Sequence, residues 1–432
     1  MSFSFKKGIH PPAKKELSKS FELTEFKTPK IVHISMSQHI GAIAEVCVAV
    51  GDRVLCGSLI GKAKGFVSAN VFSSVSGKVL GTVMLPNALG NMVPHIKIEN
   101  DFKYEATSLP ILENPTGEEI VARIQEAGIV GMGGATFPTF IKLKPSKKVD
   151  VLIINGAECE PYITCDYRLL LEKTKDVIEG AQLLKKALGV DKCYIGIEEN
   201  KLDAIKLLQQ SVTAGVEIVP LKTKFPQGAE KQLIFAITKR VVPCGKLPMD
   251  VGAVVDNVHT AYSTFCAVKL GLPCFMRAMT VSGKGVNKPN NYWVRNGVSY
   301  QDIYNECQGG EPYLNVAKVI SGGPMMGFSQ PDLRVCTTKG SSSLLFLTED
   351  EVRPTEYSSC INCCRCHNAC PMNLMPMFID ANTRINNIEL ANKYGAMNCI
   401  ECGCCSYVCP ANRPLVQSIK LAKKLIKERG IK

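Results

Sequence analysis

The sequence predicts a multidomain α/β protein that ends in a small helical module rich in cysteine. Three observations lead to this fold class. Runs of β-branched residues broken by glycine fill the first quarter of the chain, apolar strands alternate with helices in the middle, and two similar cysteine runs stand near the end. A chain of 432 residues has room for several domains. We therefore expect five segments: an N-terminal arm (1–30), a small β-sandwich or barrel (31–100), an α/β domain (116–265), a β-rich unit (266–335) and a helical module (350–432).

The first two segments differ in composition. Residues 1–30 are polar and contain prolines, which indicates an extended arm. In residues 31–100, glycines interrupt short apolar runs, as the turns of a small sandwich or barrel require. The phrases VGDRVLCGSLIG and VSANVFSSVSGKV resemble the biotinyl/lipoyl barrel-sandwich domain, which carries its cofactor on a lysine in a hairpin turn. The corresponding turn, 69–74, has no lysine, so we expect a docking or structural unit.

A glycine-rich loop follows the first helix of the α/β domain. Thr116 and Glu119 form a capping box that opens this helix, and Gly128 ends it. The loop reads G-M-G-G-A-T-F-P-T from Gly131 and is followed by Lys142. A dinucleotide-binding fingerprint needs a third glycine where threonine stands, and a strand before the loop. Small residues still let backbone N–H groups approach a phosphate, so the loop is a candidate phosphate site, with a plain turn as the alternative.

Polar and acidic side chains follow directly after the first apolar strand of this domain. Residues 149–154 read VDVLII, and Asn155, Glu158 and Glu160 come immediately afterwards. Open α/β sheets bind ligands at the carboxyl ends of their strands, although two nearby glutamates can also form a solvated turn. The chain then alternates helix, strand, helix and strand, which predicts a largely parallel sheet. The predicted ranges are 168–188, 192–197, 200–214 and 216–219.

Two cysteine runs define the chemistry of the last segment. C-I-N-C-C-R-C-H-N-A-C-P and C-I-E-C-G-C-C-S-Y-V-C-P each contain C-x2-C-x2-C-x3-C-P, which binds a [4Fe–4S] cluster and lends its fourth cysteine to the other cluster. A zinc site is the alternative, but its spacing differs. Using Cys364 or Cys404 destroys the repeat, so we expect neither to be a ligand. The expected ligands are Cys360, Cys363, Cys366 and Cys409 for the first cluster, and Cys370, Cys399, Cys402 and Cys405 for the second.

The spacing and composition of the chain indicate the type of cluster module and its cellular compartment. The 28 residues between Cys370 and Cys399 include a helix-like stretch, which indicates a helical ferredoxin module that transfers single electrons. Twenty cysteines in a chain of this length fit a reducing cytoplasm. No apolar stretch reaches the roughly 18 residues of a membrane-spanning helix, and the N-terminus lacks the apolar core of a signal peptide.

The net charge of the chain is positive. It is +12 at pH 7, and eight thiolates with two cationic cluster cores would lower it to about +8. A positive remainder favours an acidic redox partner or an anionic membrane surface. Nucleic acid is not expected as a partner, because no basic stripe with interleaved aromatic residues is present.

The motifs together resemble two related families. G-M-G-G-A-T-F-P-T-x-x-K followed by N-G-A-E-C-E-P is similar to the FMN- and NADH-binding subunit of respiratory complex I, whose pattern reads G-R-G-G-A-G-F-P-T-x-x-K and N-x-D-E-x-E-P. With F-K-K-G-I-H-P-P, S-Q-H-I-G-A, I-N-G-A-E-C-E-P-Y-I-T-C-D and the twin cysteine runs, the resemblance extends over nearly the whole chain. The sequence thus resembles the RnfC family, the C subunits of the Rnf (electron transport) complex, a ferredoxin:NAD+ oxidoreductase.

The resemblance implies a site for FMN and NAD(H) in the α/β domain. Phe137 would stack on the dinucleotide. Glu160, the candidate catalytic residue, would face the incoming nicotinamide. The implied contacts to FMN come from Gly131, Gly133, Gly134 and Lys142 at its phosphate, and from Asn155 and Glu158 at the flavin.

Two shorter segments extend the implied cofactor site. F-P-Q-G-A-E-K, at 225–231, looks like the second glycine turn of the complex I subunit, with Gly228 and Glu230 as cofactor contacts. N-V-H-T, at 257–260, looks like the segment that borders the flavin, with Asn257 as the contact.

The sequence departs from the complex I pattern at two positions. Met132 replaces an arginine and Ala157 replaces an aspartate, so one phosphate contact and one flavin contact must be made differently or are lost. Further along, the β-rich unit 266–335 resembles the soluble-ligand-binding β-grasp (SLBB) domain that the complex I subunit also carries.

The family resemblance implies an enzyme subunit on the cytoplasmic side of the cell membrane, attached peripherally. It would pass electrons between NAD(H), FMN and two [4Fe–4S] clusters, in an ion-translocating ferredoxin:NAD+ oxidoreductase. Its partners would be the integral membrane subunits of the Rnf complex and a ferredoxin-type iron–sulfur subunit. Two alternatives remain: a soluble NADH-dependent cobalamin reductase of similar architecture, and a flavin-free iron–sulfur relay or scaffold.

Overall fold

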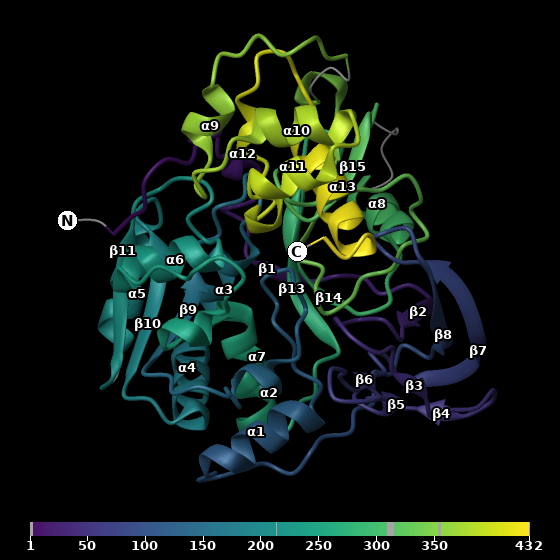
Figure 1. The fold of residues 1–432 in the computed structure, drawn as a ribbon. Coiled ribbons are helices and arrows are strands. Elements are labelled where there is room, and N and C mark those ends of the chain that lie inside the picture. Colours follow the sequence, from purple (N-terminus) through teal and green to yellow (C-terminus); the bar gives the residue numbers. More distant parts are fainter. Residues whose placement is uncertain (1–2, 213, 309–314, 353–355, 432) are drawn as a thin grey trace.

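The chain forms four bodies of secondary structure: an N-terminal β-unit, a parallel α/β domain, a mixed sheet and a cysteine-rich helical module. The computed structural model describes residues 3–212, 214–308, 315–352 and 356–431. Figure 1 shows the parallel α/β domain in teal, the N-terminal β-unit in purple and blue, and the cysteine-rich helices in yellow-green above both. Residues 213, 309–314 and 353–355, which fall inside the ranges predicted for a helix, the β-rich unit and the helical module, lie outside the described residues, as do both chain ends.

The N-terminal β-unit consists of two small sheets around one apolar core. The four-stranded sheet has the order β2-β8-β7-β4 and the three-stranded sheet the order β3-β5-β6. Buried valines and isoleucines of both sheets, such as Val32, Ile60 and Ile98, form the core. The turn at 69–74 is docked rather than free, because Asn70 Nδ2 donates to the carbonyl of Glu126. The strands are β2 (Ile31–Ser35), β3 (Glu45–Val46), β4 (Arg53–Val54), β5 (Leu59–Lys62), β6 (Val71–Phe72), β7 (Gly77–Pro86) and β8 (Met92–Asn100).

The α/β domain is built on a parallel four-stranded sheet of order β11-β10-β9-β12. Its strands are apolar on both faces because helices cover both, and Ile154, Ile195 and Leu184 belong to one shared core. The strand order reverses at β9: the chain proceeds outward through β10 and β11 and then returns to place β12 on the other side. The strands are β9 (Val151–Gly156), β10 (Lys192–Glu198), β11 (Val216–Leu221) and β12 (Ala253–Asn257).

The helices of this domain follow the predicted order with one difference. The expected helix over 168–188 is two helices, because the backbone leaves the helical region at Lys173, where φ is −127° and ψ is 33°. The predicted capping box at Thr116 is present. The helices are α1 (Gly117–Glu126), α2 (Thr139–Lys142), α3 (Cys165–Glu172), α4 (Thr174–Leu188), α5 (Leu202–Ser211), α6 (Glu230–Thr238) and α7 (Val258–Lys269), with the short 3-10 helix η2 (Pro248–Val251).

A six-stranded mixed sheet lies beside the α/β domain, with order β1-β14-β13-β17-β15-β16. Two of its strands come from outside the segment 266–335: β17 lies in the middle of the sheet, and β1 is supplied by the N-terminal arm, pairing in parallel with β14. The elements are β1 (Leu23–Glu25), β13 (Met276–Ser282), β14 (Asn290–Arg295), α8 (Tyr300–Gln308), β15 (Lys318–Ser321), β16 (Phe328–Ser329) and β17 (Ser343–Leu347).

The helical module packs short helices around a core of its own. Ile379, Ile388 and Ile419 are fully buried in it. Asp380, which is also buried, accepts hydrogen bonds from the guanidinium groups of Arg384 and Arg413 and so ties two ends of the module together. Its elements, and those leading to it, are η3 (Glu349–Glu351), α9 (Arg365–Ala369), α10 (Pro376–Arg384), α11 (Ile388–Lys393), η4 (Ala396–Asn398), α12 (Cys404–Tyr407) and α13 (Leu415–Glu428).

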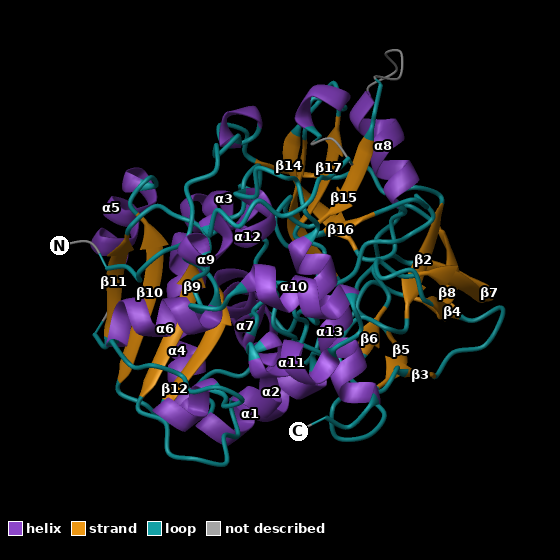
Figure 2. Cartoon of the chain, turned by 45° about the horizontal axis from the view of Figure 1, so that its top comes forward, coloured by secondary structure: helices purple, strands orange, loops and turns teal. Residues whose placement is uncertain are grey.

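The helical module contacts both the α/β domain, where Gln232 reaches Pro371, and the mixed sheet, where Lys420 lies over the Phe328 ring. In Figure 2 its helices α10, α11 and α13 stand in front, with the parallel sheet on the left, the N-terminal β-unit on the right and the mixed sheet above. The N-terminal arm reinforces this arrangement. It begins beside β11, where Phe3 N–H donates to the carbonyl of Pro220, and then passes the module, where Gly8 N–H donates to the carbonyl of Ala369. In the described residues, no helix is both long and apolar enough to cross a membrane.

Candidate functional site

The switch in strand order places two asparagines side by side. Asn155 at the end of β9 and Asn257 at the end of β12 are register partners in the sheet. Open α/β sheets bind ligands at such a switch point, outside the carboxyl ends of the strands, and we call the region between Asn155, Asn257 and the loops beside them the crevice. Asn257 also caps α7, since its Oδ1 accepts the N–H of His259 at 2.8 Å, and its Nδ2 donates to Asp166 Oδ2 at 2.7 Å.

The second glycine turn closes one side of this crevice. Asn155 Nδ2 donates to the carbonyl of Gly228 at 2.8 Å, and Asn155 Oδ1 accepts the N–H of Ala157 at 3.2 Å. A Cβ atom at Gly228 would lie 3.4 Å from both polar atoms of the Asn155 side chain. The predicted contacts Asn155, Gly228 and Asn257 are therefore brought to one place.

The glycine loop forms the opposite side. Gly131 N–H donates to the carbonyl of Phe137 at 2.8 Å, which closes the loop on itself. A Cβ at Gly133 would lie 3.5 Å from the Asn257 side chain, so the loop backbone is in van der Waals range of the end of β12. Gly134 has a φ of 118°, which only glycine adopts freely, and it has open space before it. Gly133 and Gly134 are both exposed, so the middle of the loop is open to a ligand.

Met132, which stands where the complex I pattern has an arginine, has a structural role in the loop. The Met132 side chain is buried in the core of the α/β domain, and its N–H donates to Thr260 Oγ1 at 3.0 Å. A charged side chain could not occupy this position without a partner. The residue anchors the loop and does not reach into the crevice.

Lys142 has carboxylates as its nearest charged neighbours. Its Nζ donates to the carbonyl of Val255 at 2.8 Å and lies 3.5 Å from Asp256 Oδ1. Burial opposes the charged form, but Asp256 and Glu230 outweigh it, and the pKa of Lys142 is raised. Burial raises the pKa of Glu230 as well. The predicted contacts Lys142 and Glu230 thus belong to one charged group at the floor of the crevice.

Glu158 and Glu160 point away from each other, to different partners. Glu158 Oε1 accepts the N–H groups of Asp166 and Tyr167 at the start of α3, at 2.7 and 3.3 Å. Glu160 accepts the N–H groups of Met325 and Met326 at 3.0 and 2.9 Å. Burial raises the pKa of each glutamate to about 7. Glu158 therefore faces the crevice floor, whereas Glu160 joins the strand end to the connection that leads to the helical module.

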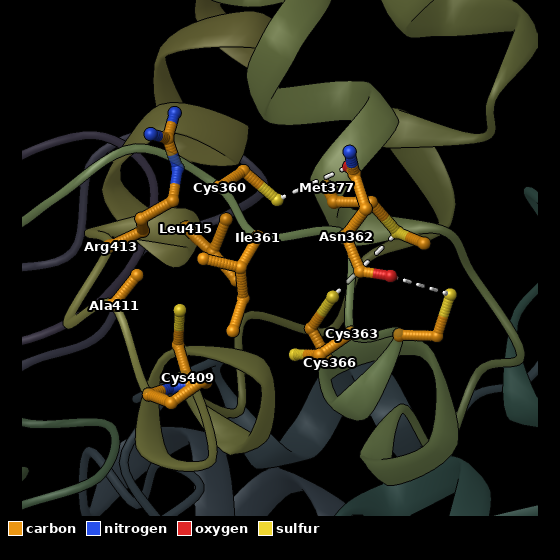
Figure 3. Close-up of a pocket in the computed structure, with 12 residues that line it drawn as sticks. Cys360, Ile361, Asn362, Cys363, Cys366, Met377, Cys409, Ala411, Arg413 and Leu415 are labelled. Atoms are coloured by element: carbon orange, nitrogen blue, oxygen red, sulfur yellow. Dashed lines mark hydrogen bonds between the residues drawn. The ribbon is translucent and has the colours of Figure 1, made fainter.

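The first cysteine cavity lies at the surface of the module. Figure 3 shows Cys360, Cys363, Cys366 and Cys409 around one space, with Cys409 contributed by the second run. Cys360 and Cys363 are exposed, and Ile361 between them is 65 % exposed. Cys364 also lines the cavity, but its Sγ points to the carbonyl of Asn362 at 3.8 Å.

The second cavity lies deeper. It is lined by Cys370, Cys399, Cys402 and Cys405, and Cys370 is contributed by the first run. The thiolates crowd one another: burial raises the pKa of Cys405, and the neighbouring Cys399, Cys402 and Cys370 raise it further. Backbone N–H groups of Leu374 and Glu401 donate to the sulfurs of Cys370 and Cys399, at 3.4 and 3.3 Å. A cationic iron–sulfur core would offset the repulsion among four such thiolates, and the N–H donors would stabilise their charge further.

Both cavities follow the predicted exchange of the fourth cysteine between the runs. Cys404, which we expected to be a non-ligand, also lines the second cavity, and it is fully buried with its Sγ 3.9 Å from the carbonyl oxygen of Phe225. Within the described residues, no three histidine, cysteine, aspartate or glutamate side chains are grouped closely enough to hold a single metal ion.

The second cavity and the crevice share a wall. Cys159, between the two glutamates, packs in one apolar cluster with Phe225, Cys402 and Cys404. Its Sγ accepts the N–H of Gly228 at 3.3 Å. A Cβ at Gly403, beside Cys402, would lie 2.8 Å from the carbonyl of Met325, whose N–H binds Glu160. The segment after β9 and the inner cysteine run therefore meet in one apolar cluster.

Two residues of the site were not predicted from the sequence. Asp166 bonds Asn257, and its Oδ1 has no hydrogen-bond partner in the described part of the chain. It stands in the I-T-C-D part of the family motif, which could have indicated it. Lys15 reaches the strand end from the N-terminal arm and lies 3.6 Å from Glu158 Oε2. No local pattern marks Lys15, because its partners are more than a hundred residues away in the sequence.

Comparison with protein families covers most of the chain. Residues 3–103 match the RnfC barrel sandwich hybrid domain, residues 124–265 match the Nuo51 FMN-binding domain, and residues 359–413 match a 4Fe-4S dicluster domain. The C subunit of the Na+-translocating ferredoxin:NAD+ oxidoreductase complex of Acetobacterium woodii is 43 % identical over 98 % of this chain and 97 % of its own length. The chain belongs to the RnfC family, the C subunits of ion-translocating ferredoxin:NAD+ oxidoreductases.

Other members of the RnfC family are similarly close. The C subunit of the proton-translocating complex of Clostridium ljungdahlii is 45 % identical over 87 % of this chain and 83 % of its own length. The C subunit of the ion-translocating oxidoreductase complex of Rhodobacter capsulatus is 42 % identical over 99 % of this chain and 84 % of its own.

These matches confirm the family, the relation to the FMN-binding subunit of complex I, and the predicted fold class of barrel-sandwich unit, α/β domain and dicluster module. The FMN-binding match begins inside α1 and includes the glycine loop, the strand end and Asn257. The dicluster match contains all eight expected cysteine ligands. An FMN-binding domain and a dicluster domain imply FMN and two [4Fe–4S] clusters. The individual ligands and the flavin contacts stay predictions.

Proposed function

We propose that this chain is the subunit at which NAD(H) exchanges electrons with a membrane-bound, ion-translocating ferredoxin:NAD+ oxidoreductase. FMN would occupy the crevice at the strand-order switch, and the two thiolate cavities would hold [4Fe–4S] clusters. The observation that carries the proposal is the wall shared by the crevice and the inner thiolates, formed by Cys159 and Phe225. A flavin site and a cluster site this close are arranged for electron transfer between them.

FMN would connect the two-electron chemistry of NAD(H) to the one-electron chemistry of the clusters. A nicotinamide gives or accepts two electrons as hydride, whereas an iron–sulfur cluster passes one electron at a time. FMN, when bound, supplies both kinds of transfer. A crevice for FMN beside a pair of clusters is thus the smallest arrangement that connects NAD(H) to a one-electron chain.

The residues of the crevice suit the parts of FMN. Backbone N–H groups of the exposed glycine loop would hold the phosphate, as glycine-rich turns do for other anions. Asp166 Oδ1 and Asp256 Oδ2 are buried acceptors without hydrogen-bond partners in the described residues, and ribityl hydroxyl groups could donate to them. Lys142 would keep its charge beside Asp256 and balance the acidic floor.

The two glutamates would act in different ways. Glu158 holds the start of α3 beside Asp166 and so shapes the floor of the crevice. Glu160 is held by the N–H groups of Met325 and Met326 at the edge nearest the module. In the role that the family resemblance implies, Glu160 would face the nicotinamide, and the Met325–Met326 turn would fix the orientation of its carboxylate.

The placement of the cavities suggests an order for the clusters. The inner cavity would exchange electrons with the flavin, and the outer cavity, with Cys360 and Cys363 at the surface, would exchange them with a partner. That partner would be a ferredoxin-type iron–sulfur subunit, and the integral membrane subunits of the complex would hold the chain at the cytoplasmic side of the membrane. The apolar Ile361 at the outer cavity offers a contact for such a partner.

The test is NADH oxidation with ferricyanide by anaerobically purified protein. We expect activity that falls by at least about tenfold in Lys142→Met, because the buried Asp256 carboxylate then loses its counter-charge. Lys147→Met is the matched control, since Lys147 is exposed and pairs with Asp250 outside the crevice. Iron without flavin and without NADH oxidation would instead establish a flavin-free relay. Reduction of cobalamin at comparable rates, without membrane partners, would favour the cobalamin reductase.

A further inference from the structure

The loop from Glu158 to Ile163 has a strained backbone. Glu158 has a φ of 46° and Tyr162 a φ of 68°, both in the left-handed region that residues other than glycine rarely adopt. Residues in such conformations persist only when their surroundings hold them there, and they concentrate at functional sites. This loop carries both glutamates of the crevice edge.

One ammonium group occupies the inside of this loop. Lys15 Nζ donates to the carbonyls of Glu158 at 3.0 Å and Glu160 at 3.1 Å, and also to the carbonyl of Ile163. A lysine has three donors, and these three carbonyls use all of them. Lys15 Nζ lies 3.6 Å from the Glu158 carboxylate, and the lysine side chain is 12 % exposed. Three carbonyls directed at one point fix the orientation of three peptide groups.

The N-terminal arm is secured on both sides of Lys15. Tyr162 N–H donates to the carbonyl of Ala13 at 2.9 Å, and Ser18 Oγ is 2.7 Å from Thr164 Oγ1. Upstream, Lys7 Nζ donates to the carbonyl of His367 in the helical module at 3.0 Å. The arm thus touches the module and then delivers Lys15 to the crevice edge.

We propose that Lys15 is a positioning residue, which holds the loop from Glu158 to Ile163 in the strained shape that places Glu158 and Glu160 at the crevice. This inference rests on the proposed function, because its effect is on the reaction with NADH. All three hydrogen bonds of the Lys15 ammonium go to this loop, so its role is to fix the protein side of the site. The N-terminal arm therefore contributes a positioning residue to the electron-transfer site.

Paired substitutions separate positioning from general stability. Lys15→Met keeps an unbranched side chain, one atom shorter and without donors, whereas Lys15→Arg keeps a cation with several donors. We expect Lys15→Met to lower kcat/KM for NADH by about tenfold or more with FMN content and Tm close to those of the wild type, and Lys15→Arg to retain several-fold more activity. Lys19→Met is the matched control, since Lys19 lies on the same arm and is exposed.

Chemical rescue provides a second, independent measurement. Lys15→Ala removes three carbons and the ammonium, which n-propylammonium replaces atom for atom. We expect n-propylammonium to restore NADH oxidation several-fold and saturably, and tetramethylammonium, which has no N–H donor, to restore none. If Lys15→Met does not accumulate as folded protein, Lys15→Gln, which loses the charge and one of the three donors, takes its place, and we again expect its kcat/KM for NADH to lie below that of Lys15→Arg.

The outcomes are distinguishable from those that test the proposed function. If the wild type holds no flavin and does not respond to NADH, the proposed function fails and the role of Lys15 fails with it. If the wild type is active and Lys15→Met matches Lys19→Met, only the positioning role is wrong. Equal losses in Lys15→Met and Lys15→Arg, with no rescue of Lys15→Ala by n-propylammonium, would likewise overturn it.

Discussion

The two thiolate cavities arise from nearly the same sequence run but have different surroundings. The outer cavity exposes Cys360 and Cys363 to solvent, whereas Cys370, Cys402 and Cys405 of the inner cavity are buried. The inner cavity adjoins Cys159 and Phe225 of the α/β domain, and the outer one adjoins the exposed Ile361. The comparison indicates that the cysteine spacing selects the cofactor. The way the module packs against the α/β domain then determines which cluster would lie near the flavin and which would lie near a partner.

The largest expected effect comes from removing the inner cluster. Cys402→Ala should lower the rate at which NADH reduces the outer cluster by about a hundredfold or more, because the wall beside the crevice then has no acceptor. Rapid-freeze EPR after mixing with NADH measures this. Unchanged reduction of the outer cluster would show that electrons reach it by another route.

Removing the outer cluster should leave the reduction of the inner cluster by NADH nearly unchanged. In Cys363→Ala, NADH should still reduce the inner cluster at a rate within about twofold of the wild type, since the crevice and its wall are untouched. Transfer to an added ferredoxin should be lost. If Cys363→Ala instead stops reduction of the inner cluster, the assigned order of the two clusters is reversed.

Chelation should separate the cavities by their exposure. We expect an iron chelator in mildly oxidising buffer to remove the outer iron on the order of tenfold faster than the inner iron, because Cys360 and Cys363 are open to solvent. The measurement is iron release over time, which should show two phases of similar amplitude. A single phase would contradict the difference between the cavities.

A substitution at the surface tests the docking role of the outer cavity. Ile361→Glu should weaken electron transfer to a ferredoxin partner several-fold, because it removes an apolar contact and adds a charge that repels an acidic surface. NADH oxidation with ferricyanide should not change. Ile385→Glu, at another exposed apolar position of the module, is the control.

The smallest expected effect is on the pH dependence of Tm, through the buried carboxyl group of Glu158. Burial raises the pKa of Glu158 from 4.5 to about 7, so its contribution to stability is complete below about pH 4.5 and is lost as the pH rises towards 7. Glu158→Gln should therefore reduce the fall in Tm between pH 5 and pH 8 by a few degrees. Glu389→Gln, an exposed glutamate of the helical module, should leave this fall unchanged.

Much of the site could be predicted from the sequence because its motifs are local. The glycine loop, the Asn155–Glu160 strand end and both cysteine runs each lie within a dozen residues. Their backbone conformations are set by small residues and by spacing, which a single sequence displays. Even the exchange of Cys370 and Cys409 between the cavities agrees with the expected repeat.

The remaining features depend on contacts between distant segments. The sequence does not indicate that β1, in the predicted arm, completes the mixed sheet, or that the returning β12 places Asn257 beside Asn155. Lys15 looks like any other lysine in a polar segment until its three carbonyl partners are seen. Such pairings are chosen by packing between domains, which local periodicity does not record.

Cofactor content and response to NADH of the anaerobically purified wild-type chain test the central claim most directly. We predict about eight irons and one releasable FMN per chain, with loss of both flavin and cluster absorbance when NADH is added. Protein that holds the iron but takes up no flavin on reconstitution, and whose absorbance NADH does not change, would contradict the claim.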